Sequence, residues 1–271
     1  MGGSVFIETL RQSWRQMLYW GVAFGLIMLM MVLIIPGMEG AMQSMLDLLR
    51  NLPPFMVSMI GVDPNNIEWI ASPEGFIAVG FFGKMLLFMA AYPVVMGMRV
   101  TANEEDDGSL DMLLSLPVPR WRVVLEKFAA YALTLVVVSA LMYVGLWVGE
   151  QMVQLGLNMG RMGEAIFNMI PAMLFILAFT TLIGAMLRRK RIILGVATAF
   201  VLVSFMLTTI GQMGAGSIAE HVQWVSFFTY NDSTGVVETG LVWTNILILT
   251  VVALGMLGGA LWAFDRRDVG V

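Results

Sequence analysis

The sequence has little of what a soluble enzyme would use. Its 271 residues contain no cysteine and one histidine, His221, and only 13% of them are charged. The lack of cysteine excludes disulfides, thiolate metal sites and cysteine nucleophiles. One histidine cannot make an HExxH zinc motif, and the stretch from Gly80 to Lys84 lacks the GxxxxGK[ST] spacing of a phosphate-binding loop. We therefore expect no catalytic residue, no metal site and no cofactor in this chain.

Apolar residues, in contrast, are abundant. They make up 59% of the chain, and the mean hydropathy of +0.83 is far above that of a soluble domain. Six apolar segments have close to the ~20 residues that a helix needs to cross the hydrocarbon core of a bilayer. They cover about 19–36, 76–98, 128–148, 165–187, 192–211 and 241–264. The sequence predicts an all-α integral membrane protein with a single transmembrane domain over 1–271.

Residues 1–17 have a different pattern from the six spans. Apolar residues recur at helical spacing and polar or charged residues occupy the other face. The apolar set is Phe6, Leu10, Trp14 and Met17, and the polar set is Glu8, Arg11, Gln12 and Arg15. We expect an amphipathic helix on the membrane surface. The segment 19–36 is too long for the apolar core of a signal peptide and is interpreted as a retained first span.

The positions of lysine and arginine predict the orientation. Twelve of the fifteen fall on one side of the six predicted spans, and only Arg50 and Arg161 fall on the other, with Lys84 inside a span. The twelve are Arg11, Arg15, Arg99, Arg120, Arg122, Lys127, Arg188, Arg189, Lys190, Arg191, Arg266 and Arg267. By the positive-inside rule, both termini and the connector 101–127 face the cytoplasm of a plasma (inner) membrane.

Three loops are then expected on the outer side: 37–75, 151–164 and 212–240. The first has methionines and leucines at helical spacing, which predicts a short amphipathic helix on the outer leaflet. Three of its methionines share one face, so a copper pathway is a minor alternative to ordinary packing. The last loop contains Trp224, Phe227, Phe228 and Tyr230, rings that we expect at a headgroup boundary.

The stretch Thr101–Phe128 is the longest strongly charged part of the chain. Four consecutive acids, Glu104 to Asp107, precede an apolar face of leucines, and Pro117 breaks the pattern before the next span. Acids favour the start of a helix because of its dipole. We expect a short amphipathic cytoplasmic helix here. The alternative is a solvated loop whose acids only keep it in water.

This stretch resembles the region between the second and third spans of ABC-2 type permeases. The matching elements are Glu105, Gly108-Ser109-Leu110, the run LLSLPVPR from Leu113 to Arg120, and Glu126-Lys127. Ser109 stands where threonine is commoner in the family. The resemblance implies the transmembrane subunit of an ABC exporter, in which two six-span subunits pair as a homodimer or heterodimer. It also implies two separate cytoplasmic ATPase subunits that carry the ATP and Mg²⁺ and act through the helix between spans two and three.

On this resemblance, the acids and leucines of the connector are the predicted docking site for the ATPase. Acids would meet basic residues at the rim and leucines would fill a groove. The set is Glu104, Glu105, Asp106, Asp107, Leu110, Leu113 and Leu114. Arg11 and Arg15 are candidates to pair with the acids. Membrane lipids are the other expected partner, and no feature indicates nucleic acid.

Lys84 is the one cation inside a predicted span. An ionisable residue at that depth marks a substrate path or a subunit interface, with Glu150 or Glu164 as possible partners. The alternative is a lysine whose head snorkels to the interface. A set of span hydroxyls is open to two interpretations, as path lining or as bonds to the backbone. That set is Thr180, Thr181, Ser204, Thr208 and Thr209.

The substrate is not encoded in any motif. Apolar spans and small outer loops favour an amphiphilic or lipid-like molecule, and export rather than import is implied by the resemblance. The main alternative function is a membrane protein that works without ATP, either a secondary transporter or an assembly scaffold. Secondary transporters often contain inverted repeats and ionisable groups at the midplane. The sequence has no internal repeat, and Lys84 is the one residue of that kind.

Overall fold

The computed structural model describes residues 4–53, 56–57, 67–101, 119–187, 189–213, 221 and 223–266. All regular structure in these ranges is helical. Six helical stretches are long and apolar enough to cross a membrane: Val5–Met38, Pro73–Thr101, Trp121–Val153, Met159–Met186, Lys190–Gly211 and Trp243–Asp265. The predicted all-α membrane protein with six spans is confirmed.

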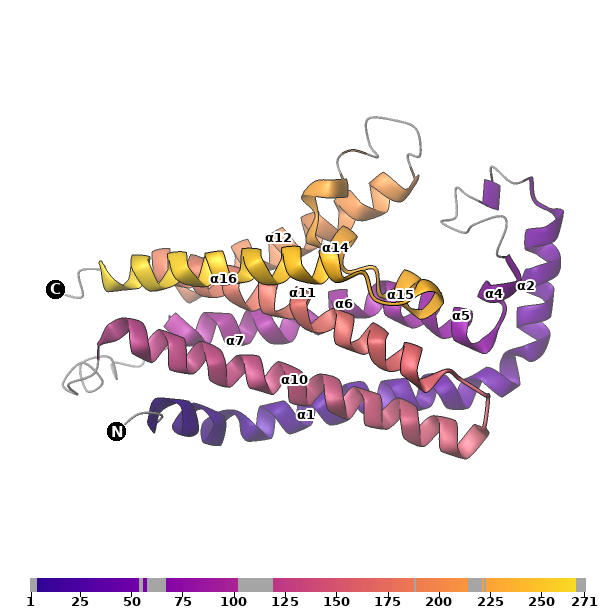
Figure 1. Ribbon diagram of the computed structural model, residues 1–271, viewed down its shortest axis with the longest axis horizontal. Coiled ribbons are helices and arrows are strands. Elements are labelled where there is room, and N and C mark those ends of the chain that lie inside the picture. The colour runs from indigo at the N-terminus through magenta and orange to yellow at the C-terminus, as the bar shows by residue number, and fades with distance from the viewer. Residues whose placement is uncertain are drawn as a thin grey trace.

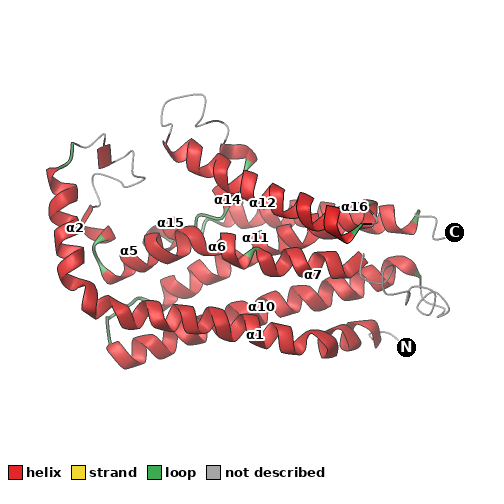
Figure 2. Ribbon diagram, turned by 180° about the vertical axis from the view of Figure 1, so that it is seen from behind, coloured by secondary structure: helices red, strands yellow, loops and turns green. Residues whose placement is uncertain are grey.

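Helices α1 (Ser4–Ile34) and α10 (Arg120–Val153) lie side by side along most of their length (Figures 1 and 2). Glycines line the seam between them, so the two backbones almost touch. A Cβ on Gly145 would come within 2.0 Å of the Gly25 carbonyl oxygen. Small residues allow this close approach. In lipid there is no hydrophobic effect between helices, so the van der Waals packing that the approach permits is what holds them together.

The amphipathic segment expected at 1–17 is not a separate helix, because residues 4–34 form one unbroken helix. Its 31 residues span about 46 Å, which is longer than the ~30 Å hydrocarbon core. No proline interrupts it before Pro36, and contact with α10 continues along it. Thr9 and Ser13 are buried, whereas Arg11 and Arg15 are exposed. Trp14 of the predicted apolar set is also exposed, at 47%, so the placement of this segment on the membrane surface stays a prediction.

Helix α11 (Met159–Met186) is the central helix of the bundle. It packs against α7, α10 and α16, and 67% of its most apolar window is buried. For α12 (Lys190–Met213) and α16 (Trp243–Asp265) the buried shares are only 22% and 28%. These two helices therefore present wide apolar faces to whatever surrounds the subunit.

The second span is divided into four helical pieces: α5 (Pro73–Ile77), a π-helical turn η2 (Ala78–Phe82), α6 (Gly83–Met89) and α7 (Ala91–Thr101). The Ser72 hydroxyl accepts a hydrogen bond from the Gly75 N–H at 3.1 Å and caps α5. The break at Ala90 places Pro93 in the first turn of α7, where the missing proline N–H costs no hydrogen bond within the helix.

At the far end of α1 the chain turns away from the bundle through η1 (Ile35–Met38) into α2 (Glu39–Asn51) (Figure 1). The short helix expected in this outer loop is present. It is tied to α4 (Ile67–Ile70) by an ion pair between Arg50 and Glu68 at 2.8 Å.

The segment before the last span is folded rather than a loose loop. It contains η3 (Gln223–Val225), α14 (Phe227–Tyr230) and α15 (Ser233–Thr239). Trp224 is 57% exposed, but Phe227 and Phe228 are only 3% and 8% exposed. The Phe227 ring packs against Phe175 of α11 and Phe200 of α12, with centroid distances of 5.2 and 5.8 Å, and those two rings are 6.1 Å apart. The prediction of headgroup rings is therefore wrong for Phe227 and Phe228, because they belong to the core.

The first helix starts and the last helix ends at the same end of the bundle (Figure 1). The end of α7, the start of α10 and the start of α12 lie there too. We call this the connector end, since the connector 101–127 begins at the end of α7 and finishes in the first turns of α10. It carries the described members of the basic set, so the predicted grouping of charge at one end is present.

Candidate functional site

The candidate site is the connector end. The predicted docking residues lie outside the described residues, and so does the whole of 102–118; they are Glu104, Glu105, Asp106, Asp107, Leu110, Leu113 and Leu114. The two points where this segment joins the bundle, Thr101 and Pro119, are described. The contacts around these two points determine which helices a displacement of the connector would move.

On one side, the last turn of α7 packs directly on α11. A Cβ on Gly97 would lie 2.7 Å from the Thr180 Cβ, and a Cβ on Gly184 would lie 2.2 Å from the Thr101 hydroxyl. The helices therefore fit together with no spare space at this crossing. Because α11 is the central helix, displacement of Thr101 would be passed to the middle of the bundle.

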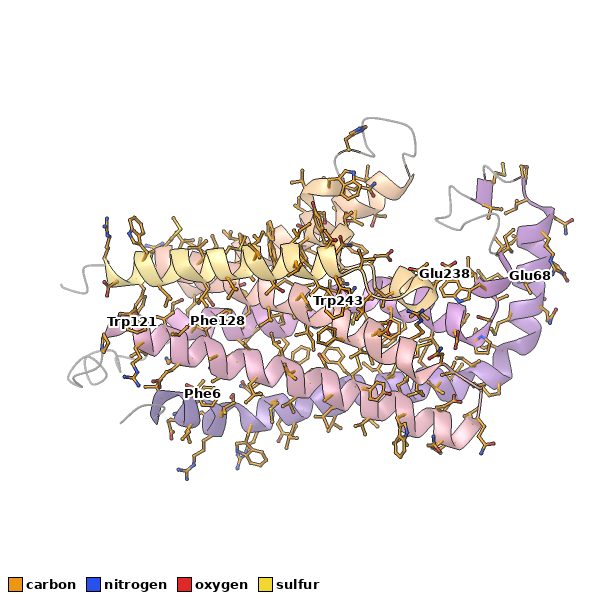
Figure 3. The ribbon with its side chains drawn as sticks, viewed as in Figure 1. Phe6, Glu68, Trp121, Phe128, Glu238 and Trp243 are labelled. Carbon is orange, nitrogen blue, oxygen red and sulfur yellow. The ribbon has the colours of Figure 1, made fainter. Side chains whose placement is uncertain are left out.

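On the other side, the first turns of α10 hold the start of α1. The Glu126 carboxylate accepts a hydrogen bond from the Phe6 N–H at 3.2 Å and another from the Arg122 Nε at 2.9 Å. Phe6 is in the first turn of α1, where backbone N–H groups have no partner within the helix and the helix dipole favours an anion. Figure 3 shows Phe6 at the same end of the bundle as Trp121 and Phe128 of α10.

A third contact joins α1 to α7 at this end, because the Arg99 guanidinium donates a hydrogen bond to the Gln16 side-chain oxygen at 2.5 Å. The connector end is thus a four-helix unit of α1, α7, α10 and α11. Arg11 and Arg15 are exposed on α1, and their predicted partners lie in 102–118, outside the described residues.

The structure does not bring Lys84 together with either predicted acid. Lys84 is exposed on α6, and no described residue forms an ion pair or hydrogen bond with it. One Glu150 oxygen accepts hydrogen bonds from the Gly156 and Leu157 N–H groups at 2.8 and 3.2 Å. Glu150 therefore holds the loop between α10 and α11. The role of Lys84 stays a prediction.

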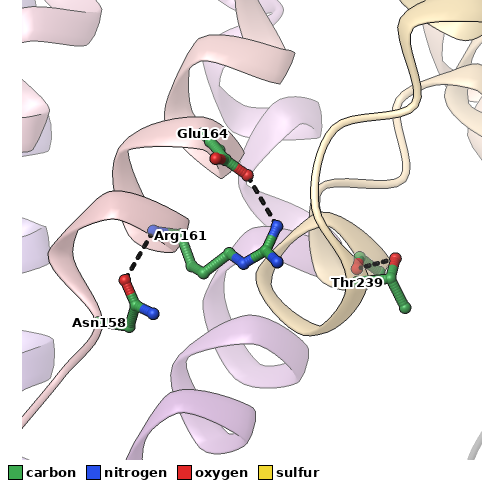
Figure 4. A network of polar contacts seen from close by, with 5 residues as sticks. Asn158, Arg161, Glu164 and Thr239 are labelled. Atoms are coloured by element: carbon green, nitrogen blue, oxygen red, sulfur yellow. Dashed lines mark hydrogen bonds and ion pairs between the residues drawn. The ribbon is translucent and has the colours of Figure 1, made fainter.

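Glu164 pairs instead with Arg161, at 3.1 Å on the same helix (Figure 4). Asn158 caps that helix by accepting the Arg161 N–H at 3.2 Å. The Arg161 guanidinium also lies against Gly240 at the end of α15, where a Cβ would come within 1.9 Å of its Nη1. A cation beside the carbonyl end of a helix is favourable. Glu164 thus holds the Arg161 guanidinium, which lies against the carbonyl end of α15.

The span hydroxyls divide into two groups. Thr180, Thr181 and Thr209 donate to carbonyls one turn earlier in their own helices, at 2.7 to 3.0 Å. These three match the alternative in which hydroxyls serve the backbone. In contrast, Thr208 donates to the Ser226 hydroxyl at 2.8 Å, and Ser226 donates to the Ser204 carbonyl at 2.7 Å. This second group attaches the segment before α14 to α12.

Helix α15 is attached to two spans through hydroxyls. Thr234 donates to the Ala78 carbonyl in the π-helical turn at 3.2 Å, and Ser233 donates to the Ala165 carbonyl of α11 at 3.2 Å. The Asn168 side-chain amide donates to the Ser233 hydroxyl at 3.3 Å. The π-helical turn, α11 and α15 therefore meet at the end of the bundle opposite the connector.

A comparison with protein-family models matches residues 4–269 to the ABC-2 family transporter protein model. The match covers nearly the whole chain, so this protein belongs to the ABC-2 transporter family and is a multi-pass permease subunit of an ABC transporter. Membership implies partnership with an ABC ATPase subunit. No curated protein sequence matched the chain.

Two contacts, one at the connector end and one at α15, were not predicted from the sequence. Glu126 was noted only as part of the family motif, and its contact with Phe6 joins residues 120 positions apart. The attachment of α15 was missed because its short helix lies in a segment with an aromatic run typical of a membrane interface. The available signal was Asp232, a residue that favours a helix start, just before Ser233 and Thr234.

Proposed function

We propose that this subunit exports an amphiphilic or lipid-like molecule and is driven by two ABC ATPase subunits that dock on the connector 101–127. A second permease subunit, identical or homologous, completes the transporter. Both termini and the connector face the cytoplasm of the plasma (inner) membrane. ATP and Mg²⁺ bind in the ATPase subunits.

The observation that supports this proposal is the pair of anchors around the connector. Thr101 packs on the central helix α11, and Glu126 holds the start of α1. A movement of the connector would therefore reach both sides of the bundle through contacts that are already formed. Such an arrangement suits a lever that an outside protein pushes, because both ends of the segment join helices that pack closely on their neighbours.

The docking surface is tested by co-purification with the ATPase subunit encoded beside this gene. Replacing Leu113 and Leu114 by glutamate should remove the ATPase from the purified complex while the permease stays monodisperse. The matched control is Met45→Glu combined with Leu48→Glu, exposed on α2 outside the six spans, which should not remove the ATPase. Retention of the ATPase and of transport in the double connector variant would contradict the proposal.

The orientation is tested with single cysteines, which are unique labels because the chain has none. Gln12→Cys near the start of α1 and Asn51→Cys at the end of α2 are both exposed and lie at opposite ends of the bundle. In intact cells, a membrane-impermeant maleimide should label the second and not the first. The reverse result would overturn the orientation.

The substrate class is tested by hydrolysis. The permease and its ATPase, reconstituted in lipid discs, should hydrolyse ATP faster when a transported amphiphile is added. Stimulation by hydrophilic compounds alone would contradict the proposed class. Transport by the purified permease with no ATPase present would instead support an ATP-independent carrier.

A further inference from the structure

The second span carries a basic side chain on an otherwise apolar surface. Lys84 is exposed on α6, about 16 Å along the helix axis from Pro73 at the start of the span and about 25 Å from Thr101 at its end. Both distances exceed the length by which the span outreaches the ~30 Å hydrocarbon core, so Lys84 lies within that core. A cation at that depth is unfavourable unless water or an opposite charge compensates it.

No described residue forms an ion pair or hydrogen bond with Lys84. Five of the acids described in the half of the bundle opposite the connector have other partners. These are Glu68 with Arg50, Glu74 with the Asn158 N–H at 2.6 Å, Glu150 with the Gly156 and Leu157 N–H groups, Glu164 with Arg161, and Asp232 with the Gly235 N–H at 2.9 Å. Within the part of the chain that the structure describes, the Lys84 cation therefore stays available to an anion from outside.

The surface around Lys84 has room for an acidic group and an apolar side for an attached chain. Gly80, one turn before Lys84, is exposed and adds no side chain, and the nearest atom to a Cβ there would be the Met31 methyl group at 3.2 Å. Phe88, one turn after Lys84, is 64% exposed. The three positions share one side of the span. An acidic group at Lys84 would lie beside Gly80, with a hydrocarbon chain along Phe88, toward the centre of the bilayer.

The backbone next to Lys84 is irregular. The π-helical turn η2 ends at Phe82, two residues before Lys84, and its Ala78 carbonyl accepts a hydrogen bond from the Thr234 hydroxyl at 3.2 Å. Turns of this kind are rare and occur frequently at functional sites. The irregular backbone and the uncompensated cation are separate observations, and both indicate a ligand site on this side of the span.

We propose that Lys84 binds the acidic group of an amphiphile, a carboxylate or a phosphate, whose hydrocarbon chain lies against Phe88. The inference rests on the proposed function for the amphiphilic class and adds the sign of the charge. It involves none of the docking residues. A transported amphiphile and an anionic membrane lipid share this chemistry, and the test distinguishes the two sources.

Binding is measured with the full chain purified in phosphatidylcholine discs, without the ATPase, as labelled dodecyl phosphate or dodecanol retained in excess of empty discs. Dodecyl phosphate should bind at least about tenfold more tightly than dodecanol, the range expected for a hydrogen bond to a charged group. Lys84→Met should remove this preference, and Lys84→Arg, which keeps the charge, should retain it. Phe88→Ala should weaken both compounds by a similar factor, because it removes the contact with the chain.

The matched control is Arg11→Met, which removes a positive charge at an exposed position of α1 and should keep the preference. Lys84→Met should unfold at a temperature no lower than that of the natural chain, because it removes a cation from the hydrocarbon core. Equal binding of the two compounds to the natural chain would overturn the proposal. So would a preference that persists in Lys84→Met. Either result would leave the proposed transport function standing.

The source of the amphiphile is identified in two further arms. With the ATPase present, a transported occupant requires that dodecyl phosphate stimulates ATP hydrolysis by the natural chain and not by Lys84→Met. In discs that contain phosphatidylglycerol, displacement of dodecyl phosphate with no stimulation of hydrolysis would instead assign the site to a membrane lipid. Both results support an anion at Lys84 and differ only in where the anion comes from.

Discussion

At the connector end, α7 packs on α11 with backbone and side chain in direct contact, and a carboxylate on α10 caps α1. At the opposite end, α15 is attached to α11 and the π-helical turn by neutral hydrogen bonds of 3.2 to 3.3 Å. Each such bond contributes about 0.5–1.5 kcal/mol net. The two ends therefore differ in the kind of contact: close packing and a charged cap at the connector end, and neutral hydrogen bonds with two buried valines, Val236 and Val237, at α15.

The largest expected effect comes from separating α1 and α10 at their glycine seam, in the half of the bundle away from the connector. Gly145→Ala would place a Cβ 2.0 Å from the Gly25 carbonyl oxygen, which forces the helices apart. We expect destabilisation of more than about 3 kcal/mol and loss of the monodisperse peak in size-exclusion chromatography. Gly255→Ala on α16, with no atom within 4 Å, is the control and should be neutral or stabilising. Normal folding of the Gly145 variant would contradict the close seam.

A second prediction concerns the contact between Gly240, at the end of α15, and the Arg161 guanidinium. Gly240 has φ of 98° and lies against Arg161, so Gly240→Ala adds backbone strain and displaces the guanidinium. We expect a loss of about 2–3 kcal/mol, measured as a lower temperature of thermal unfolding in detergent. Gly156→Ala is the matched control, because Gly156 also has a positive φ of 76° but open space around it. If both variants lost the same stability, backbone strain alone would explain the loss and the contact with Arg161 would contribute nothing.

Glu126→Gln tests whether charge matters to the cap of α1. The amide keeps the shape but loses the negative charge that interacts with the helix start and with Arg122. We expect a loss of about 1–2 kcal/mol in thermal unfolding and a several-fold drop in ATP hydrolysis coupled to transport. Glu8→Gln, at an exposed position on α1, is the control. If coupling were unchanged while stability fell, Glu126 would be structural alone.

The smallest effect is expected for Thr234→Val, which removes the bond from α15 to the Ala78 carbonyl. We expect a loss of about 0.5–1.5 kcal/mol and faster limited proteolysis within 231–242. Thr244→Val, exposed at the start of α16, should change neither measurement. A Thr234 variant with the natural stability and cleavage rate would show that α15 is held mainly by its apolar contacts.

Much of the fold follows from the sequence, because a span needs only a local run of apolar residues. The six spans, the clustering of basic residues and the family motif are all local patterns. The contacts between α10 and α1 are not, since Glu126 and Phe6 are 120 positions apart and no spacing rule connects them. The pairing of Lys84 with Glu150 or Glu164 was predicted from charge alone. In the structure Glu150 accepts backbone N–H groups and Glu164 pairs with Arg161.

The π-helical turn at Ala78–Phe82 also changes how the second span is oriented about its own axis. A turn of this kind accommodates one residue more than an α-helical turn, so the side chains after it are rotated by about 100° relative to an uninterrupted helix. Lys84, two residues beyond the turn, owes its outward direction partly to this offset. Loss or gain of a single residue there would redirect the side chains of α6 and α7, between this turn and the connector end.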